Sequence, residues 1–232
     1  MVPDTEVVIK TLDIYNRHMS EHDADEVREV DHERKKLQNA IDELLPDIDL
    51  IPIASRELMP FGWRKASKGR TVWRIVEEVI SQNLEKEAQR LGFQNIVPSP
   101  SEVSVYDFKF KFPNLRDSFV NIKSAVSGKR ASKDDISKAI RLIEHFEENP
   151  ESNLFIATFE MDFTTDPGVA LRKCTVMPLQ WIPDIYVNPS NNGNLQSAYA
   201  KHLTSAVKRS RAEFLNKLEE EIQNANRKRR AR

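Results

Sequence analysis

The sequence has few of the residues that mark disulfide-rich, loop-rich or membrane proteins. Its 232 residues include six glycines and one cysteine, Cys174. A single cysteine excludes an internal disulfide and any zinc cluster built from cysteines, which fits a reducing cytosol. The low glycine content favours helices over loops. No run of eighteen apolar residues occurs, and the charged first thirty residues contain no signal-peptide core, so we expect a cytoplasmic protein without a membrane partner.

Motifs of several enzyme classes are also missing. The sequence contains no glycine-rich phosphate loop, no G-x-S-x-G motif and no internal repeat, which counts against an ATPase and against a multidomain machine. Lys and Arg number 35 against 36 for Asp and Glu, so net charge does not identify a partner and only local clusters can. The length favours one domain over two.

The stretch 105–127 combines two short strand patterns with charged residues. Aromatic and charged residues alternate around Asp107 in its first half, which is typical of a half-buried strand. A proline–asparagine pair breaks this run, and a second apolar run follows and ends at Lys123. Asn121 and Lys123 are two residues apart, so they project from the same face of the second strand. The pattern predicts a strand pair that brings Asp107 close to both.

Carboxylate and amide oxygens beside a lysine are what metal-dependent phosphodiester hydrolysis requires. The pattern resembles the PD-(D/E)xK nuclease superfamily, most closely its type II restriction endonucleases. Tyr106-Asp107 stands where the family has Pro-Asp, and Asn121-Ile122-Lys123 stands where it has Asp/Glu-x-Lys. The departure is Asn121, because a neutral amide binds Mg²⁺ more weakly than a carboxylate. Another acid compensates for it, or activity is reduced, or the residue is a substitution.

The resemblance implies a homodimeric enzyme that cleaves double-stranded DNA at a specific site and uses Mg²⁺ as its cofactor. Asp107 would bind the metal, with Asn121 or the backbone carbonyl of Ile122 beside it, and Lys123 would position the attacking water. Two other classes stay open. One is a weakly active or inactive DNA-binding protein with the nuclease fold, and the other is a helical protein-interaction module.

A helix is predicted over Thr71–Leu91, where apolar residues recur with a period of 3.6. At roughly 100° per residue, Glu77 lies at the edge of the apolar face and Glu78 points nearly opposite to it. The resemblance implies a glutamate from the helix before the strand pair in the metal site. We assign this role to Glu77, with Glu78 as the alternative. A glutamate at the border of an apolar helix face can also be an ordinary surface residue with no role in a site.

Two polar segments are candidate DNA contacts, since cations hold phosphates and small polar residues allow close approach. One precedes the helix just described and the other follows the strand pair. The alternative for the first segment is a solvated loop. The candidate DNA-binding residues are Lys65, Lys68 and Arg70 in the first segment, and Ser124, Ser127, Lys129, Arg130 and Lys133 in the second.

The remaining segments predict an α/β fold with a mixed central sheet, which the resemblance also implies. They also predict helices on the faces of the sheet and helical additions at both termini. A helix over Asp134–Phe146 followed by a buried strand over Leu154–Phe163 forms a crossover, so that strand should run parallel to the strand of Lys123. A long helix is predicted over Leu195–Asn224, before a basic tail. We expect one nuclease domain: a helical arm over 1–46 that packs on a dimer partner or on its own subunit, a catalytic core over 61–187, and the C-terminal helix and tail over 194–232.

Overall fold

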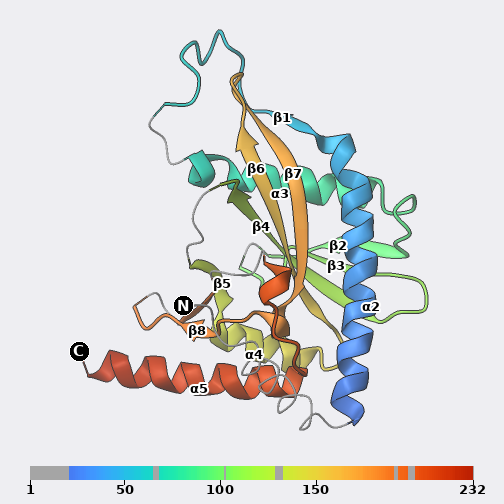
Figure 1. Ribbon diagram of the computed structural model, residues 1–232, viewed down its shortest axis with the longest axis vertical. Coiled ribbons are helices and arrows are strands. Elements are labelled where there is room, and N and C mark those ends of the chain that lie inside the picture. Colours follow the sequence, from blue (N-terminus) through green and yellow to red (C-terminus); the bar gives the residue numbers. More distant parts are fainter. Residues whose placement is uncertain are drawn as a thin grey trace, which may run out of the picture.

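A mixed six-stranded sheet forms the centre of the fold (Figure 1). The computed structural model describes residues 21–64, 68–101, 103–128, 133–190, 193–197 and 202–231, without the side chains of residues 22 and 68–71. The elements are α2 (Glu21–Leu44), η1 (Leu45–Ile48), β1 (Leu50–Pro52), α3 (Lys68–Lys86), β2 (Asn95–Pro98), β3 (Phe108–Lys111), β4 (Asp117–Val126), β5 (Asp134–Lys138), α4 (Ala139–Glu148), β6 (Leu154–Phe163), β7 (Gly168–Pro178), η2 (Leu179–Trp181), β8 (Tyr186–Val187), β9 (Asn194–Ser197), η3 (Leu203–Ser205) and α5 (Arg211–Arg230).

The strand order in the large sheet is β1-β7-β6-β4-β3-β2. β4 and β6 pair in parallel, whereas the other neighbours pair antiparallel. The apolar first half of β6 is fully buried in the sheet interior, as expected of a strand covered on both faces. The mixed α/β sheet flanked by helices, the central place of β6 and the parallel crossover are therefore confirmed.

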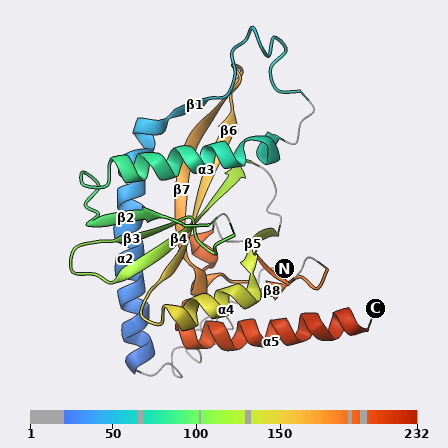
Figure 2. The ribbon, with the colours of Figure 1, turned by 180° about the vertical axis from the view of Figure 1, so that it is seen from behind.

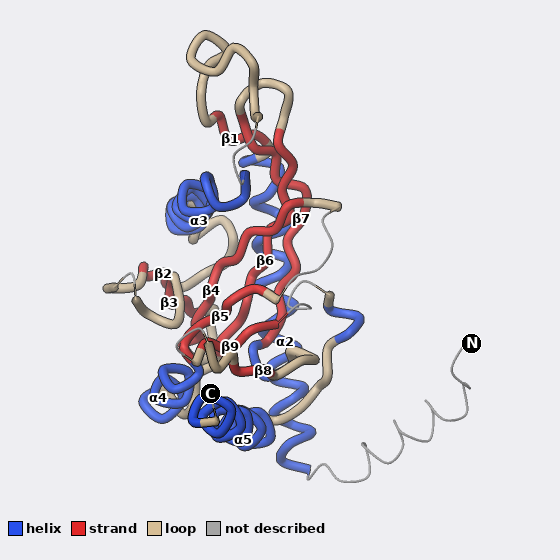
Figure 3. The backbone as a smooth tube through the Cα atoms, turned by 90° about the vertical axis from the view of Figure 1, so that its left-hand side faces the viewer, coloured by secondary structure: helices blue, strands red, loops and turns tan. Residues whose placement is uncertain are grey.

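α2 and α3 cover opposite faces of this sheet, which Figure 3 shows edge-on. α2 packs on β7, and the side chain of Gln38 bridges the two elements. Its amide nitrogen donates to the Cys174 carbonyl (3.0 Å) and its oxygen accepts from the backbone N–H of Val176 (2.8 Å). The apolar stripe of α2 is buried against the chain's own sheet. Residues 1–20 of the arm lie outside the described residues, and dimerisation stays a prediction.

α3 lies across the other face and packs against β4 and β2 (Figure 2). The predicted apolar stripe is confirmed, because Val72, Val76, Ile80 and Leu84 are fully buried. The helix begins at Lys68 and ends at Lys86, five residues before the predicted end, and turns follow it up to Gly92. Packing of this apolar face therefore holds the residues at its border, which include Glu77, beside the sheet.

Two predicted helices are partly wrong. Residues 134–138 form β5 instead of the first turn of a helix, because they pair with β9 in a second, three-stranded sheet of order β5-β9-β8. Residues 194–197 form β9, and α5 begins only at Arg211. Ser210 caps α5, since its hydroxyl accepts from the N–H of Glu213 while the Glu213 carboxylate accepts from the N–H of Ser210.

α4 and α5 lie side by side at the lower end of the sheet (Figure 1). The rings of Phe146 on α4 and Phe214 on α5 meet edge-on, with their centroids 6.3 Å apart. The predicted basic tail forms the last turn of α5, with Arg227, Lys228 and Arg229 exposed there. Among the helices of the described ranges, none carries an apolar stretch that could span a bilayer.

Candidate functional site

Asp107 stands immediately before β3, at the edge of β4. Its backbone N–H donates to the Val120 carbonyl (2.7 Å), and its Oδ2 accepts from the backbone N–H of Ile122 (2.5 Å). The last residue pair between the two strands on this side is Phe108 with Val120. Beyond it, the Asp107 carboxylate accepts the N–H of Ile122 in place of a backbone carbonyl. The predicted strand pair is confirmed, and it holds this carboxylate against the segment that contains Lys123.

The backbone carbonyl of Ile122 opens toward the same edge of β4. In an extended strand the N–H and the C=O of one residue point to the same side. Since the N–H of Ile122 reaches the Asp107 carboxylate, its carbonyl oxygen lies on the Asp107 side of the strand. A carboxylate oxygen and a backbone oxygen are therefore presented together, which is the ligand chemistry that hard cations prefer.

Glu77 on α3 is close enough to Asp107 and Lys123 for their charges to act on its carboxyl group. Burial and, after it, the neighbouring charge of Asp107 raise the pKa of its carboxyl to about 8, while Lys123 and Arg74 oppose the rise. The charge of Asp107 acts on the pKa of Glu77, which favours Glu77 of the two predicted alternatives. The Glu78 carboxylate is exposed and accepts a hydrogen bond from Gln82 (2.7 Å).

The pKa of Asp107 is raised as well. Burial is the largest cause, while the Ile122 N–H, Lys123 and Arg74 lower the pKa and offset part of the rise. Two neighbouring carboxyl groups that are both hard to ionise resist carrying two negative charges at once. A perturbed acid pair of this kind beside a cleft is typical of a functional site.

A cleft of about 990 Å³ runs between α3 and strands β2 and β3, and both acids line it. Arg74, Ser99 and Tyr106 contribute to the same walls. The carboxyl groups are therefore within reach of a ligand from solvent. Lys123 is half-buried at the adjacent strand and approaches the two acids from there.

Asn121 is almost fully buried, with 7% of its surface exposed. Its side-chain nitrogen donates to the Val105 carbonyl (2.9 Å). The amide oxygen is buried and has no hydrogen-bond partner within the part of the chain described. Only an amide can donate to Val105 from this position, because a carboxylate has no hydrogen to give. This contact is a physical reason for asparagine where the resembled family has an acid.

The described residues contain no group of three His, Cys, Asp or Glu side chains that could hold a metal ion. Two carboxylates nevertheless suit Mg²⁺, which keeps several of its waters and binds through one or two carboxylates together with substrate phosphates. Asp107, Glu77 and the Ile122 carbonyl fit this ion. The buried, unpartnered oxygen of Asn121 is a further donor of the same chemical type.

The structure places only some of the candidate DNA-binding residues. Ser124 and Ser127 are half-buried at the carboxyl end of β4, next to Lys123. Lys133 is exposed, and its ammonium lies 3.8 Å from the ring centroid of Tyr186. Lys68 and Arg70 fall in the first turn of α3, and their side chains are not described. Three candidates lie outside the described residues, namely Lys65, Lys129 and Arg130.

Sequence reasoning missed Arg74. It precedes Glu77 by three residues on α3, so both side chains emerge on one side of the helix. Its charge acts on the pKa of both Glu77 and Asp107. The signal available in the sequence was the three-residue spacing of Arg74 and Glu77, which on a helix brings a cation next to the candidate acid.

No protein-family model and no curated protein matches this chain. Among solved structures the chain is similar to the NlaIV restriction endonuclease, with 13% sequence identity and a TM-score of 0.44. The alignment covers 87% of this chain and 89% of that chain. The chemistry of the present chain therefore has to follow from its own residues.

Proposed function

We propose that the protein is an Mg²⁺-dependent nuclease that hydrolyses double-stranded DNA, and that it acts as a homodimeric, site-specific type II restriction endonuclease. One observation carries this proposal: the Asp107 carboxylate accepts a hydrogen bond from the N–H of Ile122 on the next strand. The charges of Asp107 and Lys123 act on Glu77, and the charge of Lys123 also acts on Asp107. The two acids line a cleft of about 990 Å³, which supports access of a phosphodiester to them.

Each residue has a distinct task in this proposal. Asp107, Glu77 and the Ile122 carbonyl hold the cation, which when bound lowers the pKa of a coordinated water and polarises the phosphate. The Lys123 ammonium orients the attacking water and stabilises the negative charge that develops on the phosphate. Arg74 lines the same cleft and offers a second positive charge to the DNA backbone.

A DNA-binding protein that does not cleave is the second candidate. Asn121 supports it, because its amide nitrogen is engaged by Val105 and its position supplies no negative charge. Weaker metal binding would slow or abolish hydrolysis and leave the cationic contacts to DNA intact. The two candidates differ in one measurable property, which is whether the phosphodiester bond breaks.

Incubation of supercoiled plasmid with the purified protein tests the choice. Discrete fragments that require Mg²⁺ and disappear with EDTA support the nuclease, retarded but intact plasmid supports the binder, and neither result supports the protein-interaction module. Asp107→Ala should abolish cleavage. Asp117→Asn is the matched control, since Asp117 is an acid at the far end of β4 that pairs with Lys109. Equal loss of cleavage in both variants would contradict the assignment of the site.

A further inference from the structure

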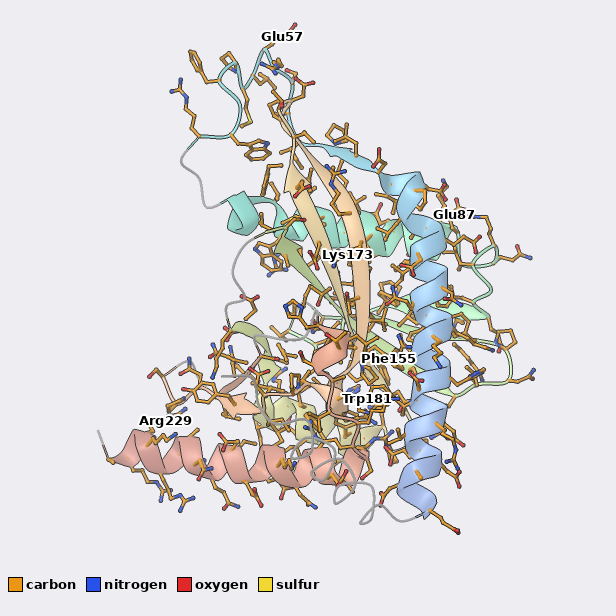
Figure 4. All side chains as sticks on the ribbon, viewed as in Figure 1. Glu57, Glu87, Phe155, Lys173, Trp181 and Arg229 are labelled. Carbon is orange, nitrogen blue, oxygen red and sulfur yellow. The ribbon has the colours of Figure 1, made fainter. Side chains whose placement is uncertain are left out.

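The loop between β1 and α3 exposes large apolar side chains. In this 53–64 loop, Leu58 is 79% exposed and Phe61 is 72% exposed. The loop stands out at the upper end of the molecule, with Glu57 at its far end (Figure 4). Exposed apolar side chains that gather on a projecting element mark a surface that contacts a partner.

The base of the 53–64 loop is fixed to the turn between β6 and β7. The N–H groups of Ile53 and Ala54 both donate to the Pro167 carbonyl (2.9 and 3.0 Å). The Trp63 ring meets the Phe163 ring edge-on, with their centroids 4.9 Å apart. An anchored base means that the exposed tip is held out by the fold.

The tip presents an aromatic ring together with a cation. The guanidinium of Arg64 lies over the Phe61 ring, 4.0 Å from its centroid, a distance at which cation and ring attract each other. A tight turn brings the two together: the N–H of Gly62 donates to the Met59 carbonyl (2.9 Å), and Gly62 has a positive φ of 59°. Residues with a Cβ rarely adopt that backbone conformation.

The sequence that follows Glu57, the one acid of the 53–64 loop, is basic. Between Leu58 and Val76 the sequence has no acid, and its charged residues are Arg64, Lys65, Lys68, Arg70 and Arg74. The last of these already lines the cleft of the candidate site. Since α3 rises 1.5 Å per residue, its start lies roughly 14 Å from Glu77, which is about four base pairs along a duplex. A duplex bound at Glu77 can therefore also contact the start of α3, which follows the loop in the sequence.

We propose that the 53–64 loop is a DNA wedge. Phe61, supported by Leu58, inserts between base steps in the minor groove of the duplex whose phosphodiester lies at Asp107, and Arg64 neutralises a flanking phosphate. Apolar wedges flanked by cations bend DNA in this way, and the bend lets the duplex contact more protein surface. This inference deepens the proposed function and rests on it for the position of the duplex.

The test compares Phe61→Ala and Leu58→Ala with Ile140→Ala, a matched control that is 54% exposed on α4. Affinity for a 30-base-pair duplex is measured by fluorescence anisotropy without divalent metal, so that no cleavage intervenes. Phe61→Ala should weaken binding by about tenfold, the low end of the loss expected for an aromatic residue that stacks on a base. The control should bind like the wild type, and circular dichroism should show all variants folded.

Two further readouts separate a wedge from simple charge attraction. Arg64→Ala should reduce the slope of log Kd against log salt by about 0.9, the value of one phosphate contact, and Phe61→Ala should leave the slope unchanged. In a duplex that carries 2-aminopurine, the wild type should raise the fluorescence by unstacking the base. Phe61→Ala should not.

Several outcomes overturn the wedge. Unchanged affinity and unchanged 2-aminopurine fluorescence in Phe61→Ala overturn it even if the wild type cleaves plasmid, and the nuclease proposal then stands alone. Loss of DNA binding in Phe61→Ala with no cleavage by the wild type supports the wedge and removes the nuclease. No DNA binding at all overturns the wedge, as does Phe61-dependent binding to phosphatidylserine vesicles in place of DNA. A dimer that dissociates in Phe61→Ala without any change in DNA affinity also overturns it.

Discussion

The protonation of Glu77 allows the electrostatics of the site to be tested without any substrate. Burial and the charge of Asp107 raise the pKa of Glu77 from 4.5 to about 8 in the folded protein. The folded state therefore holds this proton more tightly than the unfolded state. Stability that is fully present below pH 4.5 is lost as the pH rises toward 8. Glu77→Gln removes the ionisable group at nearly constant size and should abolish this loss.

The size of the effect follows from the pKa. At about 1.4 kcal/mol for each pH unit, the rise from 4.5 to about 8 corresponds to at most about 5 kcal/mol. The carboxyl is only half-buried, and water screens part of this cost. We expect Glu77→Gln to exceed the wild type in free energy of unfolding by roughly 2 kcal/mol at pH 9, and to match it within roughly 0.5 kcal/mol at pH 5.

Urea denaturation at pH 5 and pH 9 measures the difference directly. Glu78→Gln is the control, because Glu78 is the adjacent acid and is exposed to solvent. An equal free-energy difference between wild type and Glu77→Gln at the two pH values would refute the reasoning. If Glu77 holds Mg²⁺, millimolar Mg²⁺ should raise the stability of the wild type at pH 9 more than that of Glu77→Gln.

Three further variants test other residues. Lys123→Ala should abolish cleavage and largely spare DNA binding, so full activity in this variant would remove its assigned role. Asn121→Asp loses the donor to the Val105 carbonyl and should lower stability without metal by about 1–3 kcal/mol. If Asn121 touches the metal, this variant also changes the Mg²⁺ titration of cleavage, and an unchanged titration places the residue outside the site. Burial, aided by Arg211, lowers the pKa of His145 from 6.5 to about 4, so stability present above pH 6.5 is lost as the pH falls toward 4. The wild type should lose about 2 kcal/mol from this group between pH 7 and pH 5. In His145→Phe, the free energy of unfolding measured with urea should no longer contain this loss between pH 7 and pH 5. A pH profile unchanged from the wild type would exclude His145 as its source.

The elements that could be predicted from sequence are those whose signal is local. α3 has a fully buried face at helical spacing, and β6 is a continuous apolar run, so each pattern points to one structure. The strand pair that holds Asp107 was equally accessible, because its two strands and their turn lie within twenty residues. Parallel pairing of β4 with β6 followed from the intervening helix and the chirality of crossovers.

The C-terminal part was harder because its strands are short, polar and paired over long distances. β5 meets β9 about sixty residues further along the chain, and neither segment carries a strong strand pattern. Ile136, Ile140 and Ile143 mimic the spacing of a helix face, yet Ile136 lies in β5 and Ile140 is exposed. The beginning of α5 was readable, since Ser210 and Glu213 have the spacing of a capping box.

The candidate site shows the same division. The spacing of Asp107 and Lys123 is local and predicted their proximity, whereas the environment of Asn121 is set by tertiary contacts. Its hydrogen bond to the Val105 carbonyl depends on how the chain enters β3. No pattern of residue types announces such a contact.

That hydrogen bond also explains how the proposed site obtains its negative charge. A carboxylate at position 121 would face the Val105 carbonyl oxygen with no hydrogen to donate, and both oxygens would be buried and repel each other. The strand therefore favours an amide, and the second carboxylate comes from α3 as Glu77. Burial and the neighbouring charge of Asp107 raise the pKa of Glu77, and a divalent cation held by the two acids would relieve their repulsion and favour release of the proton. In the proposed enzyme Mg²⁺ affinity should thus rise with pH up to about 8.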